Sequence, residues 1–434
     1  MRNGLEAAAK EVRMTVKREE LGRRLRTARE ACRMKQEDVA KHLGVSRSTV
    51  AQMELGKRAV TSLELDKLAY LFGRDIREFL AEEFREDDAV VALFRRHPEV
   101  ADEEEVLQAL RDCVALGREI TNLERLLDID RDATALASYI LPTPRSKWDA
   151  IQQGQRIAEE ERRRLGLGAA PLPDASEILE SQGVRTAQVT LPEDVSGLTL
   201  VEPEIGVLVV ANREHHVLRR RFSYAHEYCH VLLDREQRGT ISRTGDRDDL
   251  LEVRANSFAA NLLMPEEGVR QFIYGLAKGR PSRMQADVFD EEGVTRAEGR
   301  AAPGSQAIQL YDVVLLAHHF GVSCLSALFR LRNIRLITQS ELDLLRQQDE
   351  QGTARHLGGV LGLPEPDHAA ARNEFRRRFL GLGLEALRRG EITVAKLHEL
   401  ARMVDVSRGQ IERVLEETGL DEHEEPADVL LPEA

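Results

Sequence analysis

The sequence predicts a mainly α-helical protein that contains one small antiparallel β-sheet. Apolar residues recur at helical spacing through most of the 434 residues. Only 4% of the residues are aromatic, which suits small helical domains better than a large β-sandwich or barrel. Two β-like runs, at 196–201 and 206–211, are separated by Glu202-Pro203-Glu204 and are typical of a hairpin.

Length, composition and cysteine spacing limit the class of protein. A chain of 434 residues is long enough for about three domains, and 42% hydrophobic with 32% charged residues is typical of a soluble protein with apolar cores. No apolar run approaches the roughly 20 residues that span a membrane, and the N-terminus lacks the apolar core of a signal sequence. The four cysteines are far apart, so we expect no disulfide framework, no membrane association and a cytoplasmic location.

Charge is unevenly distributed along the chain. The formal net charge of −13 would by itself disfavour binding to nucleic acid. Residues 17–80, however, contain 15 Lys and Arg against 10 Asp and Glu, a local charge of +5. Residues 421–434 contain six acidic residues and no Lys or Arg, and we expect this acidic tail to be disordered. The overall charge therefore hides a basic N-terminal module.

The basic module, residues 17–80, has the pattern of five short helices. We expect a second helix over 36–43, a left-handed turn at Gly44 and a third helix capped by Ser46. Ser62 is expected to cap a fourth helix. Two short helices joined by a tight glycine turn predict a helix-turn-helix.

The same residues closely resemble the XRE family of phage-repressor-like DNA-binding domains. The resemblance is carried by the run Gln36-x-x-x-Ala40-x-x-Leu43-Gly44-Val45-Ser46-Arg47-Ser48-Thr49-Val50-x-x-x-Glu54-x-Gly56-Lys57-Arg58. It implies that double-stranded operator DNA is the partner and that the third helix faces the major groove through Arg47, Ser48, Thr49 and Gln52. It also places Gln36 near a phosphate or a base edge, while Lys41, Lys57 and Arg58 would contact phosphates.

Residues 81–140 are charged and helical, with an apolar stripe at helical spacing. The stripe consists of Val106, Leu110, Val114, Ile120, Leu123 and Leu127. It is consistent with a dimerisation helix, and a homodimer is attractive because regulators of this kind read two half-sites. It is also consistent with a spacer that packs on its neighbours, and the pattern alone leaves both alternatives open.

Leu141-Pro142-Thr143-Pro144 marks the start of the next unit, which we expect to occupy residues 145–345. Helices are predicted at 148–165 and 175–182, followed by the hairpin. The next helix contains His226-Glu227-Tyr228-Cys229-His230. On a helix the two histidines project from one face, one turn apart, so both imidazoles can reach one metal ion. Glu227 lies where it can take a proton from water.

A catalytic zinc site usually takes three protein ligands and leaves one position open. Downstream, a helix predicted from Glu252 ends before Pro265, and Glu252 at its head is our candidate for the third ligand. Asp234, Asp248 and Asp249 are competing carboxylates, and the residues alone do not exclude them.

Two longer segments resemble the ImmA/IrrE family of metallopeptidases. They are Arg221-Phe222-Ser223-Tyr224-Ala225-His226-Glu227 and Glu252-x-x-Ala255-Asn256-x-Phe258-Ala259-x-x-Leu262-Leu263-Met264-Pro265, and the likeness extends over roughly residues 148–345. The resemblance implies a gluzincin-like α+β domain that binds Zn²⁺ through His226, His230 and Glu252, with Glu227 as the general base. Members of the family act on helix-turn-helix repressors, which they cut when stress or DNA damage is sensed.

The segment departs from the family at Tyr228-Cys229, where Leu-Gly is usual, and we expect both side chains to be packed in the core. The family resemblance places His318 and His319 on a structural helix, so we do not include them in the metal site. Weak candidates for a transition-state hydrogen-bond donor are His215, His216 and Tyr224. The strand at 207–212 is expected to pair with an extended substrate.

Two further segments lie beyond this site. Residues 276–305 are expected to form a flexible insertion rich in Arg, Gly and acidic residues. Residues 346–420 are expected to form a helical C-terminal module that ends in a helix-turn-helix-like pair. The second helix of that pair, at 407–417, carries several acidic residues, which favours packing or protein contact over DNA binding.

Two hypotheses follow for the function. The first is a sequence-specific DNA-binding transcriptional regulator with a fused zinc-dependent endopeptidase, which cleaves itself or a helix-turn-helix repressor or antitoxin in response to stress. The second is a DNA-binding repressor or antitoxin of a toxin–antitoxin operon, whose peptidase-like domain binds a partner such as a co-encoded toxin without catalysis. The complete set of ligands and base favours the first.

Overall fold

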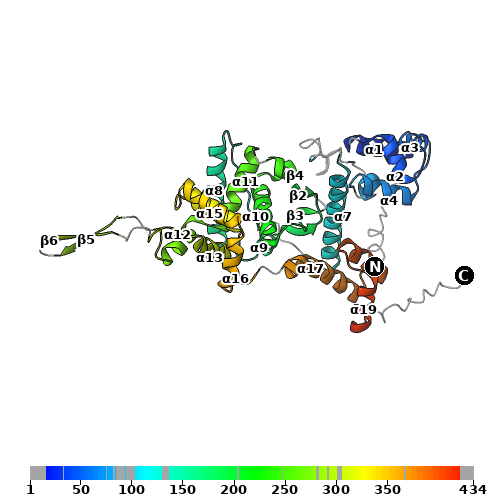
Figure 1. Cartoon of the computed structure of the whole chain (residues 1–434). Helices are drawn as coiled ribbons and strands as arrows, with labels where there is room; N and C mark the ends of the chain where they lie inside the picture. Colours follow the sequence, from blue (N-terminus) through cyan, green and yellow to red (C-terminus); the bar gives the residue numbers. More distant parts are fainter. Residues whose placement is uncertain are drawn as a thin grey trace, which may run out of the picture.

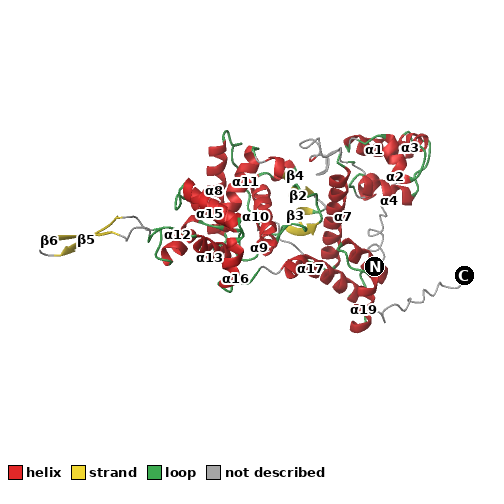
Figure 2. Ribbon diagram, viewed as in Figure 1, coloured by secondary structure: helices red, strands yellow, loops and turns green. Residues whose placement is uncertain are grey.

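Figure 1 shows the computed structural model of the chain, which is mainly helical, and Figure 2 shows the few strands of its central sheet among the helices. The predicted fold class is confirmed. The structure describes residues 16–32, 34–74, 76–81, 84, 93, 103–129, 136–202, 205–246, 248–279, 283–290, 293–300, 305–365 and 368–420, so the predicted acidic tail lies outside it. No single helix in these ranges is both long and apolar enough to cross a membrane.

The N-terminal domain has the five predicted helices. They are α1 (Arg18–Ala31), α2 (Gln36–Leu43), α3 (Arg47–Glu54), α4 (Ser62–Leu71) and α5 (Ile76–Leu80). Gly44 is left-handed, with φ 69°, between α2 and α3, and the Ser46 side chain caps α3 by accepting a hydrogen bond from the Thr49 amide. The cap of α4 is Thr61, and not Ser62 as the sequence predicted, because Thr61 forms a capping box with Glu64.

Helix α7 (Glu104–Leu126) connects this domain to the rest of the chain. Every residue of its predicted apolar stripe is at most 5% exposed. One side of α7 meets the N-terminal domain, where Tyr70 donates a hydrogen bond to Asp112 at 2.8 Å. Another side meets the sheet so closely that a Cβ at Gly117 would lie 2.9 Å from the Leu208 side chain. The stripe therefore packs within the chain, and it is not available as a dimer interface.

Four strands form the central sheet. They are β1 (Arg185–Val189), β2 (Val195–Glu202), β3 (Gly206–Asn212) and β4 (Gly239–Arg243), in the order β1-β3-β2-β4. β2 and β3 form the predicted hairpin, and β4 pairs with β2 in antiparallel fashion. β1 runs parallel to β3, so the sheet is mixed where the sequence predicted only antiparallel pairing. The parallel pair arises because the chain passes from β1 over to β2 before it returns through β3.

Helices cover both faces of this sheet. Along β3, Leu208 and Val210 belong to a core shared with α7 and α17 (His368–Arg388), whereas Val209 and Ala211 belong to a core shared with α10 (Val217–Leu233). Behind α10 lie α11 (Leu250–Leu263), α8 (Lys147–Arg164) and α9 (Ala175–Ser181). Figure 1 shows α7 on one side of the strands and α8, α10 and α11 on the other.

The central domain continues through α12 (Glu266–Gly275), α13 (Leu310–Phe320), α14 (Cys324–Asn333), α15 (Gln339–Glu350) and α16 (Thr353–Val360). Between α12 and α13, the segment expected to be a flexible insertion contains an antiparallel hairpin of β5 (Arg283–Asp290) and β6 (Gly293–Arg300), which projects from the domain in Figure 1. The predicted boundary after residue 345 falls inside α15, and both α15 and α16 pack on α13.

The C-terminal module consists of α17, α18 (Val394–Met403) and α19 (Arg408–Thr418). Asp405 has a positive φ of 55° between α18 and α19, and Ser407 caps α19, so a tight turn joins the two helices of the pair expected at this place. α17 and α18 pack on α7, and α17 also packs on β1. The module therefore completes the cover of the sheet on the α7 side.

Candidate metal centre and DNA-binding face

Helix α10 carries the His-Glu-x-x-His motif into the interior of the central domain. Residues 223–232 are buried without interruption, because the helix packs on β2 and β3 on one side and on α11 on another. His226 is 5% exposed, His230 is 1% exposed and Glu252 on α11 is 6% exposed. The fold thus brings these polar side chains together away from bulk water.

His226, His230 and Glu252 converge at one point. His226 Nε2 lies 3.1 Å from Glu252 Oε2 and 3.3 Å from His230 Nε2, and His230 Nε2 lies 3.2 Å from Glu252 Oε1. A tetrahedral ion with bonds of about 2.0 Å separates its ligand atoms by about 3.3 Å. In the described part of the chain, this is the one group of three or more His, Cys, Asp or Glu side chains whose ligand atoms all lie within 4.8 Å of one another. The residues present therefore fit a zinc ion.

The second ring nitrogen of each histidine is held by a neighbouring side chain. His226 Nδ1 lies 3.1 Å from Asn256 Oδ1, and His230 Nδ1 lies 2.9 Å from Asp234 Oδ2. An oxygen acceptor at Nδ1 places the proton of a neutral imidazole there. In this neutral form the lone pair of each Nε2 faces Glu252, as a metal site requires.

The three competing carboxylates have other partners. Asp234 supports His230 from behind and does not face Glu252 as a further ligand. Asp248 is exposed and pairs with Lys147. Asp249 caps α11. Of the four acidic candidates, the structure brings Glu252 to the two histidines.

The charges in the cluster are strongly coupled. Burial lowers the pKa of His230, but the Glu252 carboxylate and the hydrogen bond with Asp234 outweigh burial and raise this pKa to about 10. Burial raises the pKa of Glu252, but attraction to His230 and hydrogen bonds with both histidines bring it well below its ordinary value. Without a metal, the site therefore holds a proton on His230 among carboxylates. A divalent cation can replace that proton.

The Glu227 carboxylate is 0% exposed and is bound by the sheet. Thr199 on β2 donates from Oγ1 to Oε2 at 2.7 Å, and Ser242 on β4 donates from Oγ to Oε1 at 2.5 Å. Gly197 on β2 leaves room for the carboxylate, because a Cβ there would lie 3.1 Å from Glu227 Oε1. Sequence reasoning missed these three residues. The sequence offers one indication of their role: each has a small or hydroxyl-bearing side chain at a strand position that faces a buried helix.

The three weak candidates for a hydrogen-bond donor are used elsewhere. Tyr224 donates to the Ala187 carbonyl of β1 at 3.0 Å. His215 Nε2 lies 3.1 Å from the Glu193 carbonyl oxygen, and His216 caps the start of α10. None of the three is among the side chains that meet at the metal cluster.

The residues that depart from the family pattern are packed side chains, as predicted. Tyr228 and Cys229 are both 0% exposed, and Tyr228 donates a hydrogen bond to Glu161 at 2.5 Å. Burial raises the pKa of the Cys229 thiol far above its ordinary value, so this cysteine is not a reactive thiolate. His318 and His319 are exposed on α13 and do not join the cluster.

Strand β3 pairs on both sides, with β1 and with β2, so the prediction that it binds an extended substrate is wrong. The edge strand near Glu227 is β4, which carries Ser242. In the described part of the chain β4 pairs with β2 alone. An edge of this kind is where an extended peptide adds to a sheet in β-augmentation.

The side chains predicted to contact DNA gather on α3 and beside it. Exposed among them are Lys41, Arg47, Ser48, Gln52 and Lys57, and partly exposed are Gln36, Thr49 and Arg58. The Gln36 amide donates to Glu54 at 2.9 Å, and Glu54 is fixed in turn by a buried pair with Arg29 at 2.6 Å. Arg58 pairs with Glu64 at 2.9 Å, so part of its charge is already compensated.

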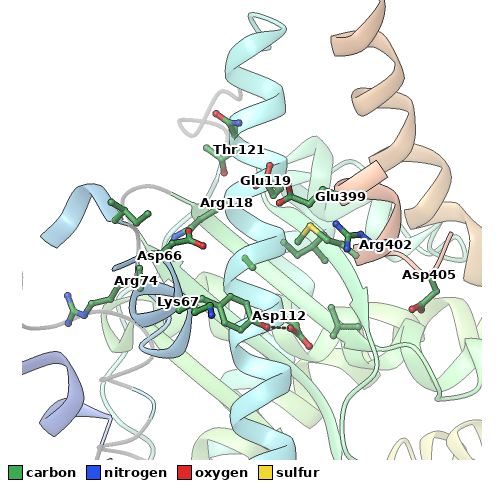
Figure 3. A pocket seen from close by; sticks show the side chains of 18 of the residues that line it. Asp66, Lys67, Arg74, Asp112, Arg118, Glu119, Thr121, Glu399, Arg402 and Asp405 are labelled. Carbon is green, nitrogen blue, oxygen red and sulfur yellow. Dashed lines mark hydrogen bonds between the residues drawn. The ribbon is translucent and has the colours of Figure 1, made fainter. Parts of the chain in front are cut away.

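A separate pocket of about 930 Å³ lies where the N-terminal domain, α7 and the C-terminal module meet. Figure 3 shows Asp66 and Lys67 on one side of α7 and Arg402 and Asp405 on the other. The lining carries both signs of charge and includes none of the residues of the metal cluster. The pocket is therefore distinct from the candidate metal centre.

Comparison with known families agrees with the structure in the N-terminal domain and in the central domain. Residues 20–80 match the helix-turn-helix domain family, and residues 179–279, which span α9 to α12, match the IrrE N-terminal-like domain family. A comparison with curated proteins finds no match to the chain. Both predicted resemblances are thus confirmed. The chain is a fusion of an XRE-like helix-turn-helix DNA-binding domain with a metallopeptidase-like domain of the ImmA/IrrE kind.

Proposed function

We propose that the chain is a cytoplasmic transcriptional regulator whose zinc-dependent endopeptidase domain acts in response to stress. Its substrate is a helix-turn-helix repressor or antitoxin, or the chain itself. The observation that carries the proposal is the buried group of His226, His230 and Glu252, with Glu227 next to the first ligand in sequence. The DNA-binding half supports a regulatory substrate. Cys113, Cys229 and Cys324 are free thiols, which supports a reducing compartment.

The mechanism follows from the residues of the site. His226, His230 and Glu252 would hold a zinc ion, which would supply Lewis acidity to the scissile carbonyl and to water near neutral pH. Glu227 accepts the proton of the attacking water and passes it to the leaving amine. The edge strand β4 binds the substrate in an extended conformation, which places the scissile bond near Ser242 and Glu227.

For the DNA-binding half, we propose that α3 enters the major groove. Arg47, Ser48, Thr49 and Gln52 read base edges there, while Gln36, Lys57 and Arg58 contact the backbone at its sides. Two copies of the chain bind the two half-sites of an operator. Because the α7 stripe is buried within one chain, the contact between the copies lies on another surface.

Metal content and proteolysis test the catalytic half. We expect His230→Ala to lose tightly bound zinc, whereas the matched control His318→Ala, an exposed histidine outside the cluster, keeps it. Purified chain with Zn²⁺ and operator or single-stranded DNA should release a fragment of itself or of a captured repressor, and Glu227→Gln should not. Equal behaviour of wild type and Glu227→Gln would refute catalysis. Pull-down with Glu227→Gln as a substrate trap then identifies the substrate.

One observation favours a second candidate function. Both oxygens of Glu227 already accept hydrogen bonds from Thr199 and Ser242, and the side chain is 0% exposed. These contacts also suit a domain that binds a partner, such as a co-encoded toxin, without catalysis. Under this alternative, cells that carry Glu227→Gln regulate their operon normally and still neutralise the toxin. Loss of regulation in those cells supports the peptidase.

A further inference from the structure

Behind the metal cluster, a buried ion pair joins the two helices that carry the ligands. Asp234 directly follows α10, and Arg254 lies on α11 two residues after Glu252. Arg254 Nη2 donates to Asp234 Oδ1 at 2.5 Å, and the two side chains are 3% and 6% exposed. The second oxygen of the same carboxylate holds His230 Nδ1 at 2.9 Å. Arg254 is therefore connected to His230 through one carboxylate.

The ion pair gives α10 and α11 a second link beside the metal cluster. The first link is the approach of His230 Nε2 to Glu252 Oε1 at 3.2 Å, which a metal ion would bridge. The second link, between Asp234 and Arg254, needs no metal. It therefore fixes the separation of the two helices, and with it the distance between the ligands, before an ion arrives.

Stability alone is a weak reason to bury this pair. Removing two charges from water costs several kcal/mol per ion, so a buried ion pair is often no more stabilising than an apolar pair of the same volume. The charges of this pair instead fix the orientation of the side chains. Because both oxygens of Asp234 are engaged, the carboxylate has one orientation, and so does the imidazole of His230.

Helix α8 also packs closely on α11. A Cβ at Gly154 on α8 would lie 2.4 Å from the Arg254 carbonyl oxygen, so the two helix backbones touch at this point. The Arg254 guanidinium also lies 3.5 Å from the Gln153 side-chain oxygen. α8 therefore supports the segment of α11 from which Arg254 reaches toward Asp234.

We propose that Asp234 and Arg254 are positioning residues that preform the metal site by fixing the His230 ring and the distance between α10 and α11. The inference rests on the proposed metal site and adds residues that act through a ligand. Loss of an outer partner of a metal-bound histidine typically weakens metal binding about 10- to 100-fold. We expect that loss in Zn²⁺ affinity for Asp234→Asn and for Arg254→Met, and a smaller loss for Arg254→Lys, which keeps the positive charge.

The experiment measures Zn²⁺ affinity of the full-length chain by competition with a chelator, together with thermal unfolding of the metal-free chain. The matched control is Glu124→Gln, which breaks another buried pair, with Arg185 at 2.7 Å, between α7 and β1. We expect the control to lose stability and to keep its Zn²⁺ affinity. His230→Ala reports on the metal site itself and should abolish tight binding.

A double exchange, Asp234→Arg with Arg254→Asp, separates positioning from stability. It keeps an ion pair between the helices but turns a guanidinium toward His230, so we expect stability to recover relative to the single variants while Zn²⁺ affinity stays low. The positioning role is refuted if the single variants bind Zn²⁺ as tightly as wild type, or if the exchange restores that affinity. If His230→Ala also binds Zn²⁺ like wild type, the metal site itself is wrong and the proposed function fails with it.

Discussion

Removal of the Ser242 hydroxyl tests how strongly the sheet holds the Glu227 carboxylate. The hydroxyl donates to Glu227 Oε1 at 2.5 Å, and both side chains are at most 3% exposed, so no water replaces the lost bond. A hydrogen bond to a charged group contributes about 1.5–3 kcal/mol, and a neutral one about 0.5–1.5 kcal/mol. We expect Ser242→Ala to lower the free energy of unfolding of the metal-free chain by about 2 kcal/mol.

The assay is a double-mutant cycle in urea at neutral pH. In the background of Glu227→Gln the acceptor is uncharged, so Ser242→Ala should cost about 1 kcal/mol less than it does in wild type. The control is Thr121→Val, whose hydroxyl donates to the Gly117 carbonyl at 2.9 Å, and its cost should be the same in both backgrounds. Equal costs of Ser242→Ala in both backgrounds would show that the hydroxyl does not stabilise the charge, and the reasoning would be refuted.

Three further predictions concern the two halves of the chain. Glu54→Ala removes the buried carboxylate that pairs with Arg29, which keeps the Met34 carbonyl at 2.8 Å and Glu30 at 3.4 Å, and it should destabilise the N-terminal domain by about 3 kcal/mol in thermal unfolding; replacing both residues with apolar ones should cost less. The pKa of His230 is raised to about 10, so below that pH a proton competes with Zn²⁺; affinity should rise as pH rises between about 6 and 9, and a flat profile would contradict this. In titrations at several salt concentrations, Arg47→Ala should weaken operator binding about tenfold and relax base preference, whereas Lys57→Ala should weaken binding to all sequences and reduce the salt slope by about one.

The helix-turn-helix was predictable because its signals are local. Helical periodicity, the left-handed Gly44 and the cap at Ser46 act within a few residues of each other, and α2 begins and ends where the sequence placed it. The one wrong cap shows the limit of such signals. Thr61 and Ser62 are adjacent residues of equally suitable type, and the position of Glu64 three residues after Thr61 decides between them.

The metal cluster was only partly predictable from the residues. The spacing of His226 and His230 is a property of one helix, but the choice of Glu252 over three other acids depends on how α11 packs against α10. The contacts of Glu227 depend on strand register, which no local pattern specifies. β1 and β4 are only five residues long. The inner residues of both strands are all buried, so neither strand shows the alternation of buried and exposed side chains that is typical of a half-buried strand.

The role of α7 was left open because an amphipathic pattern identifies the buried face of a helix but not its partner. The structure shows one apolar core that runs from the N-terminal domain through α7 to the sheet and α17. The DNA-binding domain and the metallopeptidase-like domain are therefore not separate bodies on a spacer. A substitution in the core at either end of α7 therefore affects an apolar core that the two domains share.

The shared core predicts how the chain can be divided. A fragment 141–434 lacks α7 and loses its packing on Ile205 and Leu208, which are each at most 1% exposed in the intact chain and lie within 2.9 Å of a Cβ placed at Gly117. Burial of such side chains stabilises by about 1.5–3 kcal/mol each, so the loss at these two alone is about 3–6 kcal/mol, a large part of the net stability of a typical domain. We expect this fragment to aggregate or to unfold without a cooperative transition, whereas a fragment 103–434 that keeps α7 should unfold cooperatively and bind Zn²⁺. If fragment 141–434 is monomeric in gel filtration and melts as sharply as fragment 103–434, α7 is not part of the domain that holds the metal site.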